Sequence, residues 1–529
     1  MATTSLNRES VTAAATPIPA SAYIALALLA SANLLNYLDR FVVSILAEAI
    51  KADLRLDDAQ LGFLLGTAFA IFYSIVGVAM GGISDRLSRK KVMAFGLALW
   101  SGMTALGGMA TNFVTLAAAR IGVGVGEAAA NPCSHSLLSD IFPARNRALA
   151  LGVYLAGTFL GGALAMAVGG YFLQHWSTSM CVAVPIAGAC DLAAWKAALF
   201  AVGLPGFPLA LLLLMIREPA RTASGGSHSA GVIIREFSAS LPPFTLLTVA
   251  REGGQRALRR NLAILAGIAV AAALLVMATG DYAQWIAFGT GAYVVVTWGQ
   301  IQSLRDRPLF ALTFGDRTFL YAMGATALIA CVGGAINVWA APFAMRTHAM
   351  NPSELGLRLG VIHTVGAIAG VIAGGWIADK WKQVDRRAPL GMAAISISGT
   401  LPSVLVMLLV ADLELFLAAY AAVSVFGAMW SGATAALVQD LVLPRMRGSA
   451  AACYSLIAIV VASGTGPYWA GKVSAVTGSL TTGMLSLLVL APVAMVFLWL
   501  AARRLPGETP EARLALAAAA GEPSVRDTA

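Results

Sequence analysis

Apolar stretches follow one another along the whole chain, and short polar segments that carry most of the charges separate them. Most stretches approach or exceed the roughly 18–20 residues that a helix needs to cross the hydrocarbon core of a bilayer. The short alternating segments typical of a membrane-spanning β-barrel are absent from the sequence, so we expect an all-α integral membrane protein. About fourteen transmembrane helices are predicted, in the order six, two and six: 21–47, 58–81, 91–111, 113–139, 148–173, 193–216, then 262–279 and 282–304, then 318–345, 355–378, 388–410, 413–438, 448–473 and 481–502.

The composition agrees with this pattern, because 59% of the residues are hydrophobic and only 12% are charged, against roughly 45–50% apolar residues in soluble domains. The net charge of +9 would suggest a nucleic-acid partner in a soluble protein. Here the excess lysines and arginines lie in short loops, where they fix the orientation of the helices in the membrane. We therefore expect no nucleic-acid partner.

Basic and acidic loops alternate along the chain. The loop Lys51–Asp58 carries more acid than base, and the acidic pair Asp412 and Glu414 falls on the same side of the membrane. By the positive-inside rule the basic loops face the cytoplasm. We expect a multi-pass protein of a bacterial-type inner membrane with both termini cytoplasmic. The basic loops are Asp85–Lys91, Pro143–Arg147, Asp379–Arg387, Pro444–Arg447 and Arg503–Arg504.

The polar segments divide the chain into two predicted bundles with an insertion between them. Residues 21–216 form the first six-helix bundle and residues 318–502 the second. Residues 262–304 form an inserted transmembrane hairpin, which we expect at the edge of the bundles. The linker 217–261 begins rich in Gly and Ser and ends in an amphipathic stretch, expected on the inner membrane surface where anionic lipid attracts it.

The two ends of the chain are polar. Residues 1–20 are expected to be disordered and cytoplasmic, and residues 503–529 to form a cytoplasmic tail. The apolar run that follows residue 20 is too long for the core of a signal peptide, so we interpret it as an uncleaved first span.

Two of the five cysteines, Cys181 and Cys190, lie on one predicted external loop. They form a disulfide if that face of the membrane is oxidising, although the spacing alone allows two free thiols equally well. The other three, Cys133, Cys331 and Cys453, fall within apolar runs and are expected to pack as small apolar residues.

The two predicted bundles repeat one another. The segment "GGISDRLSRKK" after the second span corresponds to "GGWIADKWKQVDRR" in the second half. In addition, Asp140, Arg145, Arg147 and Tyr154 recur at one constant offset, as Asp440, Arg445, Arg447 and Tyr454. Two paired sites in the same order indicate a duplicated six-helix unit.

The segment Gly81–Lys91 resembles the loop signature of the major facilitator superfamily, whose two halves are parallel repeats. The segments "NYLDR" (Asn36–Arg40), "RIGVGVGEA" (Arg120–Ala128) and "DIFPARNRALALGVY" (Asp140–Tyr154) look like the spinster-like branch of that superfamily. This resemblance implies the major-facilitator fold and a secondary transporter that works by alternating access. It also implies a central cavity lined by the first and fourth helices of each half, and lysolipids, sphingoid phosphates or related amphipaths as substrates.

An acid and a base, Asp39 and Arg40, lie side by side in the first span. A charge at the centre of a bilayer costs at least about 2.5–3.5 kcal/mol, so such residues are rarely accidental. In the fourth span Glu127 follows Arg120 by seven residues, about two helical turns, which places both on one face. Because the resemblance puts both helices at the cavity, we expect the four residues to form one charge cluster.

Two carboxylates in a poorly hydrated site cannot both ionise cheaply. We therefore predict proton coupling, with Asp39 and Glu127 as proton carriers and Arg40 as the counter-charge that responds to them; Arg120 belongs to the same proton-coupling set. One alternative is a buried ion-pair network that only holds two helices together. Another is direct binding of a substrate anion by Arg40, whose guanidinium matches phosphate or carboxylate in two-pronged fashion.

The resemblance also implies a cytoplasmic gate, a charge network that holds the inner side shut while the outer side is open. The alternative is that these charges only set the topology. The predicted gate residues are Gly81, Asp85, Arg86, Arg89, Arg145 and Arg147 in the first half, and Asp379, Arg445 and Arg447 in the second.

Polar and aromatic residues inside other spans are candidates for substrate contact. A lone histidine such as His363 is more often a packed, hydrogen-bonded residue than a proton carrier. The tryptophans either line the cavity or face lipid. A cavity charged on one side and aromatic on the other suits an amphipath better than a sugar. The predicted substrate-binding residues are Asn36, Tyr37, Arg40, Asn337, Trp339, His363, Trp430 and Tyr454.

No nucleophile–base pair, metal-ligand cluster or phosphate-binding loop stands out in the sequence. We therefore expect no enzyme, no cofactor and no metal. The prediction is a monomeric, proton-coupled secondary transporter of an amphipathic organic anion or lysolipid, in contact with membrane lipid. The alternatives are a broad-specificity drug exporter and a proton-coupled carboxylate importer.

Overall fold

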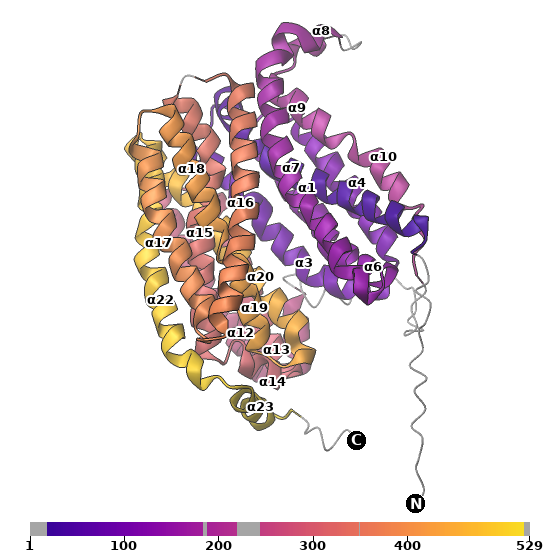
Figure 1. Cartoon of the computed structure of the whole chain (residues 1–529), viewed down its shortest axis with the longest axis vertical. Helices are drawn as coiled ribbons and strands as arrows, with labels where there is room; N and C mark the ends of the chain where they lie inside the picture. The colour runs from indigo at the N-terminus through magenta and orange to yellow at the C-terminus, as the bar shows by residue number, and fades with distance from the viewer. Residues whose placement is uncertain (1–17, 184–187, 220–243, 349, 523–529) are drawn as a thin grey trace, which may run out of the picture.

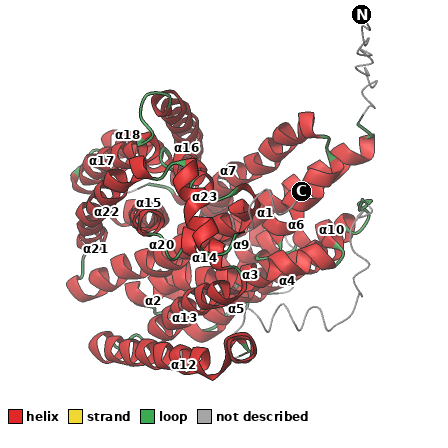
Figure 2. Cartoon of the chain, turned by 90° about the horizontal axis from the view of Figure 1, so that it is seen from below, coloured by secondary structure: helices red, strands yellow, loops and turns green. Residues whose placement is uncertain are grey.

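The structure is a computed structural model that describes residues 18–183, 188–219, 244–348 and 350–522. Every regular element within these residues is a helix, as Figure 2 shows, which confirms the predicted all-α class. Twelve helical segments of this part of the chain are long and apolar enough to cross a membrane. Two further predicted spans, α4 (Arg89–Gly107) and α13 (Tyr282–Arg305), are also helices. They are less apolar because α4 starts with three cations and α13 carries several amides and hydroxyls.

The first bundle contains the six helical segments expected from residues 21–216, several of them interrupted. The fourth segment breaks after Glu127 because Pro132 has no backbone N–H and its ring crowds the carbonyl four residues earlier. The elements are α1 (Ala20–Leu54), α2 (Asp58–Gly62) with the π-helix η1 (Phe63–Thr67) and α3 (Ala68–Arg86), α4, α5 (Phe113–Glu127) with α6 (Ala130–Ile141), α7 (Ala144–His175), and α9 (Ala194–Gly203) with α10 (Gly206–Leu213).

The second bundle repeats this order, again with a broken fourth segment. Figure 1 shows it in orange to yellow beside the indigo-to-magenta first bundle. Its elements are α15 (Arg317–Thr347), α16 (Pro352–Lys382), α17 (Ala388–Leu409), α18 (Leu413–Ala428) with α19 (Ser431–Asp440), α20 (Arg447–Thr477), and α21 (Leu480–Ser486) with α22 (Leu490–Arg504).

The two bundles meet closely where α7 packs along α16. A Cβ atom on Gly170 would lie 2.2 Å from the Pro352 carbonyl oxygen, and one on Gly356 would lie 2.2 Å from the Met166 carbonyl oxygen. These backbones can approach so closely only because the two positions are glycine.

The inserted hairpin starts earlier than predicted. Helix α12 spans Thr245–Thr279, so the last part of the predicted linker 217–261 is helical, and only residues 220–243 lie outside the described chain. The helix is kinked at Gly254, whose φ of 64° favours glycine. It ends at Gly280, which adopts the left-handed conformation common after helix C-termini.

The inserted hairpin contacts both bundles through its second helix, α13. Figure 2 shows α12 at the outer rim, whereas α13 packs against α3 of the first bundle and α20 of the second. The buried Gln284 accepts a hydrogen bond from the Thr67 hydroxyl at 2.6 Å and donates one to the Gly464 carbonyl at 2.9 Å. One side chain of the hairpin therefore touches both bundles.

The predicted tail also contains a docked helix. The guanidinium of Arg513 on α23 (Pro510–Ala519) is buried and donates to Asp316 at 2.8 Å. Figure 1 shows α23 against the lower end of the second bundle. Part of the segment 503–529, predicted as a cytoplasmic tail, is therefore a helix that packs against the second bundle.

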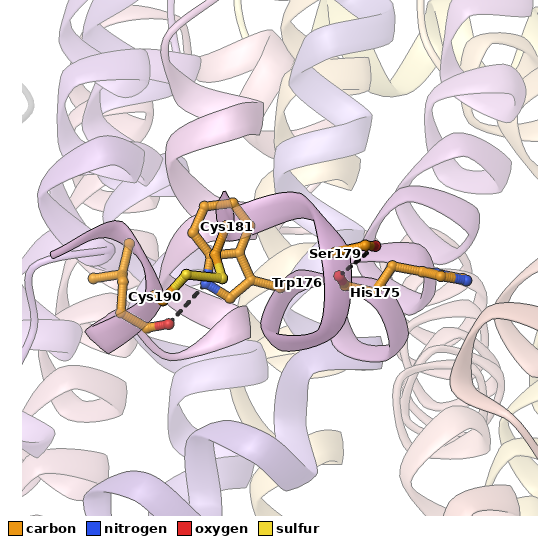
Figure 3. The surroundings of a disulfide bond; sticks show 6 residues. His175, Trp176, Ser179, Cys181 and Cys190 are labelled. Atoms are coloured by element: carbon orange, nitrogen blue, oxygen red, sulfur yellow. Dashed lines mark hydrogen bonds between the residues drawn. A yellow bond between two sulfur atoms is a disulfide. The ribbon is translucent and has the colours of Figure 1, made fainter. Parts of the chain in front are cut away.

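Cys181 and Cys190 form a disulfide, with Cα atoms 4.9 Å apart. Figure 3 shows the bond beside the Trp176 indole, which donates a hydrogen bond to the Leu192 carbonyl at 2.8 Å. The sequence left open whether these cysteines form a disulfide or two free thiols, and the structure shows the disulfide. Such bonds persist in oxidising compartments, which agrees with the predicted external position of this loop.

Candidate functional site

Two ion pairs connect α1 with α5 inside the first bundle. Arg40 Nη2 donates to Glu127 Oε2 at 2.8 Å, and Arg120 Nη1 lies 3.7 Å from Asp39 Oδ1. The Thr104 hydroxyl of α4 donates to the other oxygen of Asp39. The structure thus brings together the four residues predicted for one cluster, and it adds Thr104.

The four charged side chains differ in their exposure. Those of Asp39, Arg120 and Glu127 are at most 4% exposed, whereas that of Arg40 is 23% exposed. Arg40 is thus the member of this charge quartet that a ligand reaches most easily.

An aromatic cage, formed by Tyr37, Phe69 and Tyr73, surrounds the Arg40 guanidinium. The three ring centroids lie 4.9, 4.5 and 5.1 Å from its central carbon. Such cation–π contacts stabilise a poorly hydrated guanidinium without neutralising its charge. Arg40 therefore keeps a full positive charge beside apolar ring surface.

Several buried polar atoms of the quartet have no hydrogen-bond partner among the described residues. They are Asp39 Oδ1, Glu127 Oε1, Arg40 Nε, and Arg120 Nε and Nη2, and Asn36 Nδ2 beside them is also unpaired. Buried polar atoms normally have a hydrogen-bond partner, so an unpaired one indicates a position where a proton, a water molecule or a ligand can bind.

A polar chain continues from the cage into the first bundle. Asn131 donates to the Tyr73 hydroxyl at 3.2 Å, and Tyr154 donates to Asn131 Oδ1 at 2.9 Å. The sequence did not single out Tyr73 or Asn131. Tyr154 carried one available signal, because it is the repeat partner of the predicted site residue Tyr454.

A second polar cluster lies in the C-terminal bundle and joins two predicted residues to two that were missed. Asn337 on α15 lies 3.0 Å from His363 Nε2 on α16, and Tyr420 on α18 donates to Asn337 Oδ1 at 3.1 Å. Ser424 lies 3.5 Å from His363 Nδ1. This cluster carries no formal charge when His363 is neutral.

The remaining predicted substrate residues are placed differently from one another. Trp339 is fully buried and donates to the Pro467 carbonyl at 2.9 Å, so the prediction that it lines a cavity is wrong for this conformation. Trp430 and Tyr454 are half-buried and pack against the core of the second bundle. Tyr37 belongs to the aromatic cage, and Asn36 is buried one turn from Arg40.

At the predicted external end, a set of ion pairs that we call the external clasp joins the two bundles. Arg346 of α15 lies 2.8 Å from Asp58 of α2 and 2.7 Å from Glu48 of α1. Asp58 also accepts from Lys51 and from Ser474 of α20, each at 2.5 Å. The sequence did not reveal this clasp, because charges near the ends of spans are ordinary.

At the predicted cytoplasmic end, the ion pairs between described residues stay within one bundle or reach the hairpin region and tail. The buried Arg89 lies 2.5 Å from Asp140 and 3.1 Å from Glu218. Burial acts to raise the pKa of Glu218, but hydrogen bonds from Ser88 and Arg89 outweigh it and lower that pKa. In the second bundle Lys382 lies 2.5 Å from Asp440, the repeat partner of Asp140.

The gate is predicted to form while the outer side is open, so a pairing of Asp379 with Arg445 and Arg447 in that conformation stays a prediction. In this structure Arg445 pairs with Asp306 at 2.8 Å and with Glu522. These two acids lie closer in space to Arg445 because α14 (Arg307–Leu312) and α23 pack together beside it.

Other gate residues were predicted at positions that the structure leaves exposed or does not describe. Asp379, Arg147 and Arg447 are exposed. Gly81 and the side chains of Asp85, Arg86 and Arg145 lie outside the described residues.

Comparison with known proteins decides the family. The family model described as Major Facilitator Superfamily matches residues 29–336, more than half of the chain. The chain belongs to the major facilitator superfamily. Its fold and family are therefore those of membrane transporters.

Relatives support the spinster-like resemblance. An MFS-type efflux pump of Mycolicibacterium smegmatis is 27% identical over 493 residues, which cover 92% of this chain and 94% of the pump. Protein spinster homolog 1 of Xenopus tropicalis is 26% identical over 451 residues, which cover 84% of this chain and 71% of that protein.

A solved structure shows the same fold. The crystal structure of a bacterial homolog of the human lysosomal transporter spinster, in an inward-facing and unoccupied conformation, matches with a TM-score of 0.70 and 22% identity. The match covers 93% of this chain and 100% of that one.

Proposed function

We propose that this superfamily member is a proton-coupled secondary transporter of an amphipathic organic anion or lysolipid, with Asp39 and Glu127 as proton carriers. The observation that carries the proposal is the buried charge quartet with its unpaired atoms. A network that only fastened two helices would gain by pairing these atoms, since each unpaired buried group costs about 1–3 kcal/mol. Incomplete pairing favours a site that exchanges protons and a ligand.

Charge balance suggests how the coupling works. Two carboxylates and two guanidiniums make the quartet neutral when all four residues are ionised. A proton taken up by Glu127 leaves Arg40 without its counter-charge, and a substrate anion restores neutrality. The proton and the anion therefore strengthen each other's binding, and by thermodynamic linkage this coupling is reciprocal.

The surroundings of Arg40 favour an amphipathic substrate. Its guanidinium binds carboxylate or phosphate in two-pronged fashion, and the aromatic cage offers apolar surface directly beside it. The neutral cluster of Asn337, His363, Tyr420 and Ser424 supplies hydrogen-bonding groups for a polar part of the same molecule.

The pattern of ion pairs supports alternating access. Among the described residues, ion pairs join the two bundles at the external clasp, and none joins them at the cytoplasmic end. This fits a state closed to the outside. We propose that the protein is a monomer in a bacterial inner membrane with both termini cytoplasmic. In this orientation the arginine-rich loops lie in the cytoplasm, as the positive-inside rule requires, and the disulfide-bonded loop lies outside.

Two other functions compete with this proposal. One is a broad-specificity drug exporter, and the name of the M. smegmatis relative, an efflux pump, agrees with export. A proton-coupled importer of hydrophilic carboxylates would use Arg40 in the same way but would not need the aromatic cage.

Uptake into proteoliposomes would separate these functions. A lysophospholipid, a sphingoid phosphate and a hydrophilic carboxylate should be compared side by side, with and without an imposed pH gradient. We expect uptake of an amphipathic anion that depends on the gradient and that Arg40→Gln abolishes. Uptake of the hydrophilic carboxylate alone, or gradient-driven export of uncharged or cationic drugs, would overturn the proposed substrate class.

A further inference from the structure

The outer helix of the inserted hairpin carries a groove that the transport cycle described above does not use. No residue of the most apolar 18-residue stretch of α12 is buried, and Figure 2 shows this helix at the rim of the molecule. Between α12 and α13 lies a cavity of about 620 Å³, a size at which pockets hold small organic ligands. Its lining is almost entirely apolar or aromatic and includes Leu265, Ile268, Met277, Trp285, Ile286 and Tyr293.

The groove has the length of a lipid chain. Leu246, before the kink of α12, is one lining residue, and the others on this helix run from Leu265 to Met277, a distance of about 18 Å at 1.5 Å per residue. One leaflet contributes about half of the roughly 30 Å hydrocarbon core. The groove can therefore accommodate an acyl chain along most of its length.

Four arginines of α12 come before the groove-lining stretch Leu265–Met277 in the chain, on the side that the positive-inside rule assigns to the cytoplasm. Arg251, Arg256, Arg259 and Arg260 are all exposed, and none of them forms an ion pair with any residue that the structure describes. Arg260 and Arg259 precede Leu265 by five and six residues, about 8–9 Å along the helix axis.

Within the described part of the chain, no acid pairs with these arginines. The one acidic residue of α12 is Glu252, and both of its oxygens accept hydrogen bonds from Arg305 of α13, at 2.9 and 2.7 Å from the Arg305 Nε. Among the described residues, this end of the helix thus carries positive charge without an acidic partner, close to apolar surface.

We propose that this groove is a binding site for an anionic phospholipid of the cytoplasmic leaflet. The phosphate lies on Arg259 and Arg260, and one acyl chain lies in the groove between α12 and α13. Basic clusters beside transmembrane helices on the cytoplasmic side attract anionic headgroups. A zwitterionic lipid would gain the same apolar contact but much less from the charge, so the site distinguishes headgroups.

Such a lipid would act on the contact between the inserted hairpin and the two bundles. Because α13 touches both bundles through Gln284, a lipid that fastens α12 to α13 also stiffens the contact between the hairpin and the two bundles. This effect does not depend on the transported substrate.

Leu265 lines the groove five residues after Arg260 and is a suitable position for a fluorescent reporter. The full chain carrying Leu265→Trp is reconstituted in phosphatidylcholine that contains a small, equal fraction of bromine-labelled phosphatidylglycerol or bromine-labelled phosphatidylcholine. The fluorescence quenching that belongs to the introduced tryptophan is obtained as the difference from the parent protein. We expect the anionic labelled lipid to quench this tryptophan several-fold more strongly than the zwitterionic one.

A matched pair of variants completes the experiment. Arg259→Gln/Arg260→Gln should abolish the preference, whereas Arg503→Gln/Arg504→Gln, an adjacent exposed pair at the end of α22, should retain it. Equal quenching by the two lipids would mean bulk lipid only and would overturn the proposal. A preference that survives in Arg259→Gln/Arg260→Gln would overturn it as well, and neither result depends on any transport assay.

Discussion

At the scale of single residues, the charges inside the membrane are held by partners on other helices. Asp39 of α1 has Arg120 of α5 at 3.7 Å and accepts a hydrogen bond from Thr104 of α4. The last contact is a hydrogen bond from a neutral side chain to a carboxylate of the quartet, and it can be removed without changing any charge.

Thr104→Val should lower the free energy of unfolding by about 1–3 kcal/mol, because it leaves a buried acceptor of Asp39 without its donor. Thermal unfolding in detergent would measure the loss. Thr326→Val is the matched control, since the Thr326 hydroxyl is equally buried but bonds only to carbonyls of its own helix. An equal loss in both variants would mean that the bond to Asp39 is not special.

Part of this site could be predicted from the sequence. Asp39, Arg40 and Glu127 stand out because ionisable residues are costly in lipid, and the helical period places Arg120 with them. Thr104, Tyr420 and Ser424 could not be predicted, because hydroxyl groups are common in apolar helices and their partners depend on packing. Trp339 was misplaced for the same reason, since its sequence position cannot tell a cavity from a helix interface.

At the scale of elements, the contact between α7 and α16 sets how closely the bundles approach. Gly356→Ala should weaken it, because the new Cβ would lie 2.2 Å from the Met166 carbonyl oxygen and the helices would have to separate. We expect the externally closed state to lose population, measured as wider distances between spin labels on the external ends of α7 and α16. The control is Gly375→Ala on the same helix, where a Cβ meets nothing within 4 Å; equal widening in both variants would contradict the prediction.

The docking of α23 should depend on pH. Hydrogen bonds from Arg445 lower the pKa of Asp306 and of Glu522 below their ordinary values. A lowered folded-state pKa gives stability that is fully present above the unfolded values of roughly 4 and is lost as the pH falls below them.

The protection factors of the amides of residues 510–519 against hydrogen exchange should therefore be high at neutral pH and fall below a pH of about 4. Arg445→Gln should exchange faster at neutral pH and lose most of this acid response. An unchanged exchange profile in that variant would show that Arg445 does not hold the helix.

The spans themselves were predictable, since hydrophobic length determines which helices cross a membrane. The start of α12 at Thr245 was not, because its first turns are rich in arginine and polar residues. They are helical in the structure through packing with α13, including the contact between Glu252 and Arg305, which no local pattern reveals.

At the scale of the whole molecule, the external clasp joins residues that are almost 290 positions apart, such as Asp58 and Arg346. Arg346→Gln removes both ion pairs that cross between the bundles at this end. We expect external cysteine-reactive reagents to reach a cysteine placed near Arg40 faster in this variant than in the parent. Arg358→Gln is the control, because Arg358 pairs with Glu354 and Glu414 of its own bundle; faster labelling there too would contradict the role of the clasp.

The central claim is that the quartet of Asp39, Arg40, Arg120 and Glu127 couples protons to transport. The most direct measurement is the internal pH of proteoliposomes when an amphipathic anion is allowed to enter down its own gradient. We predict acidification of the lumen with the parent protein and none with Asp39→Asn or Glu127→Gln. At least one of these two variants should still exchange labelled for unlabelled substrate. Equal acidification with the parent and both variants would contradict the account, because the quartet would then only hold two helices together.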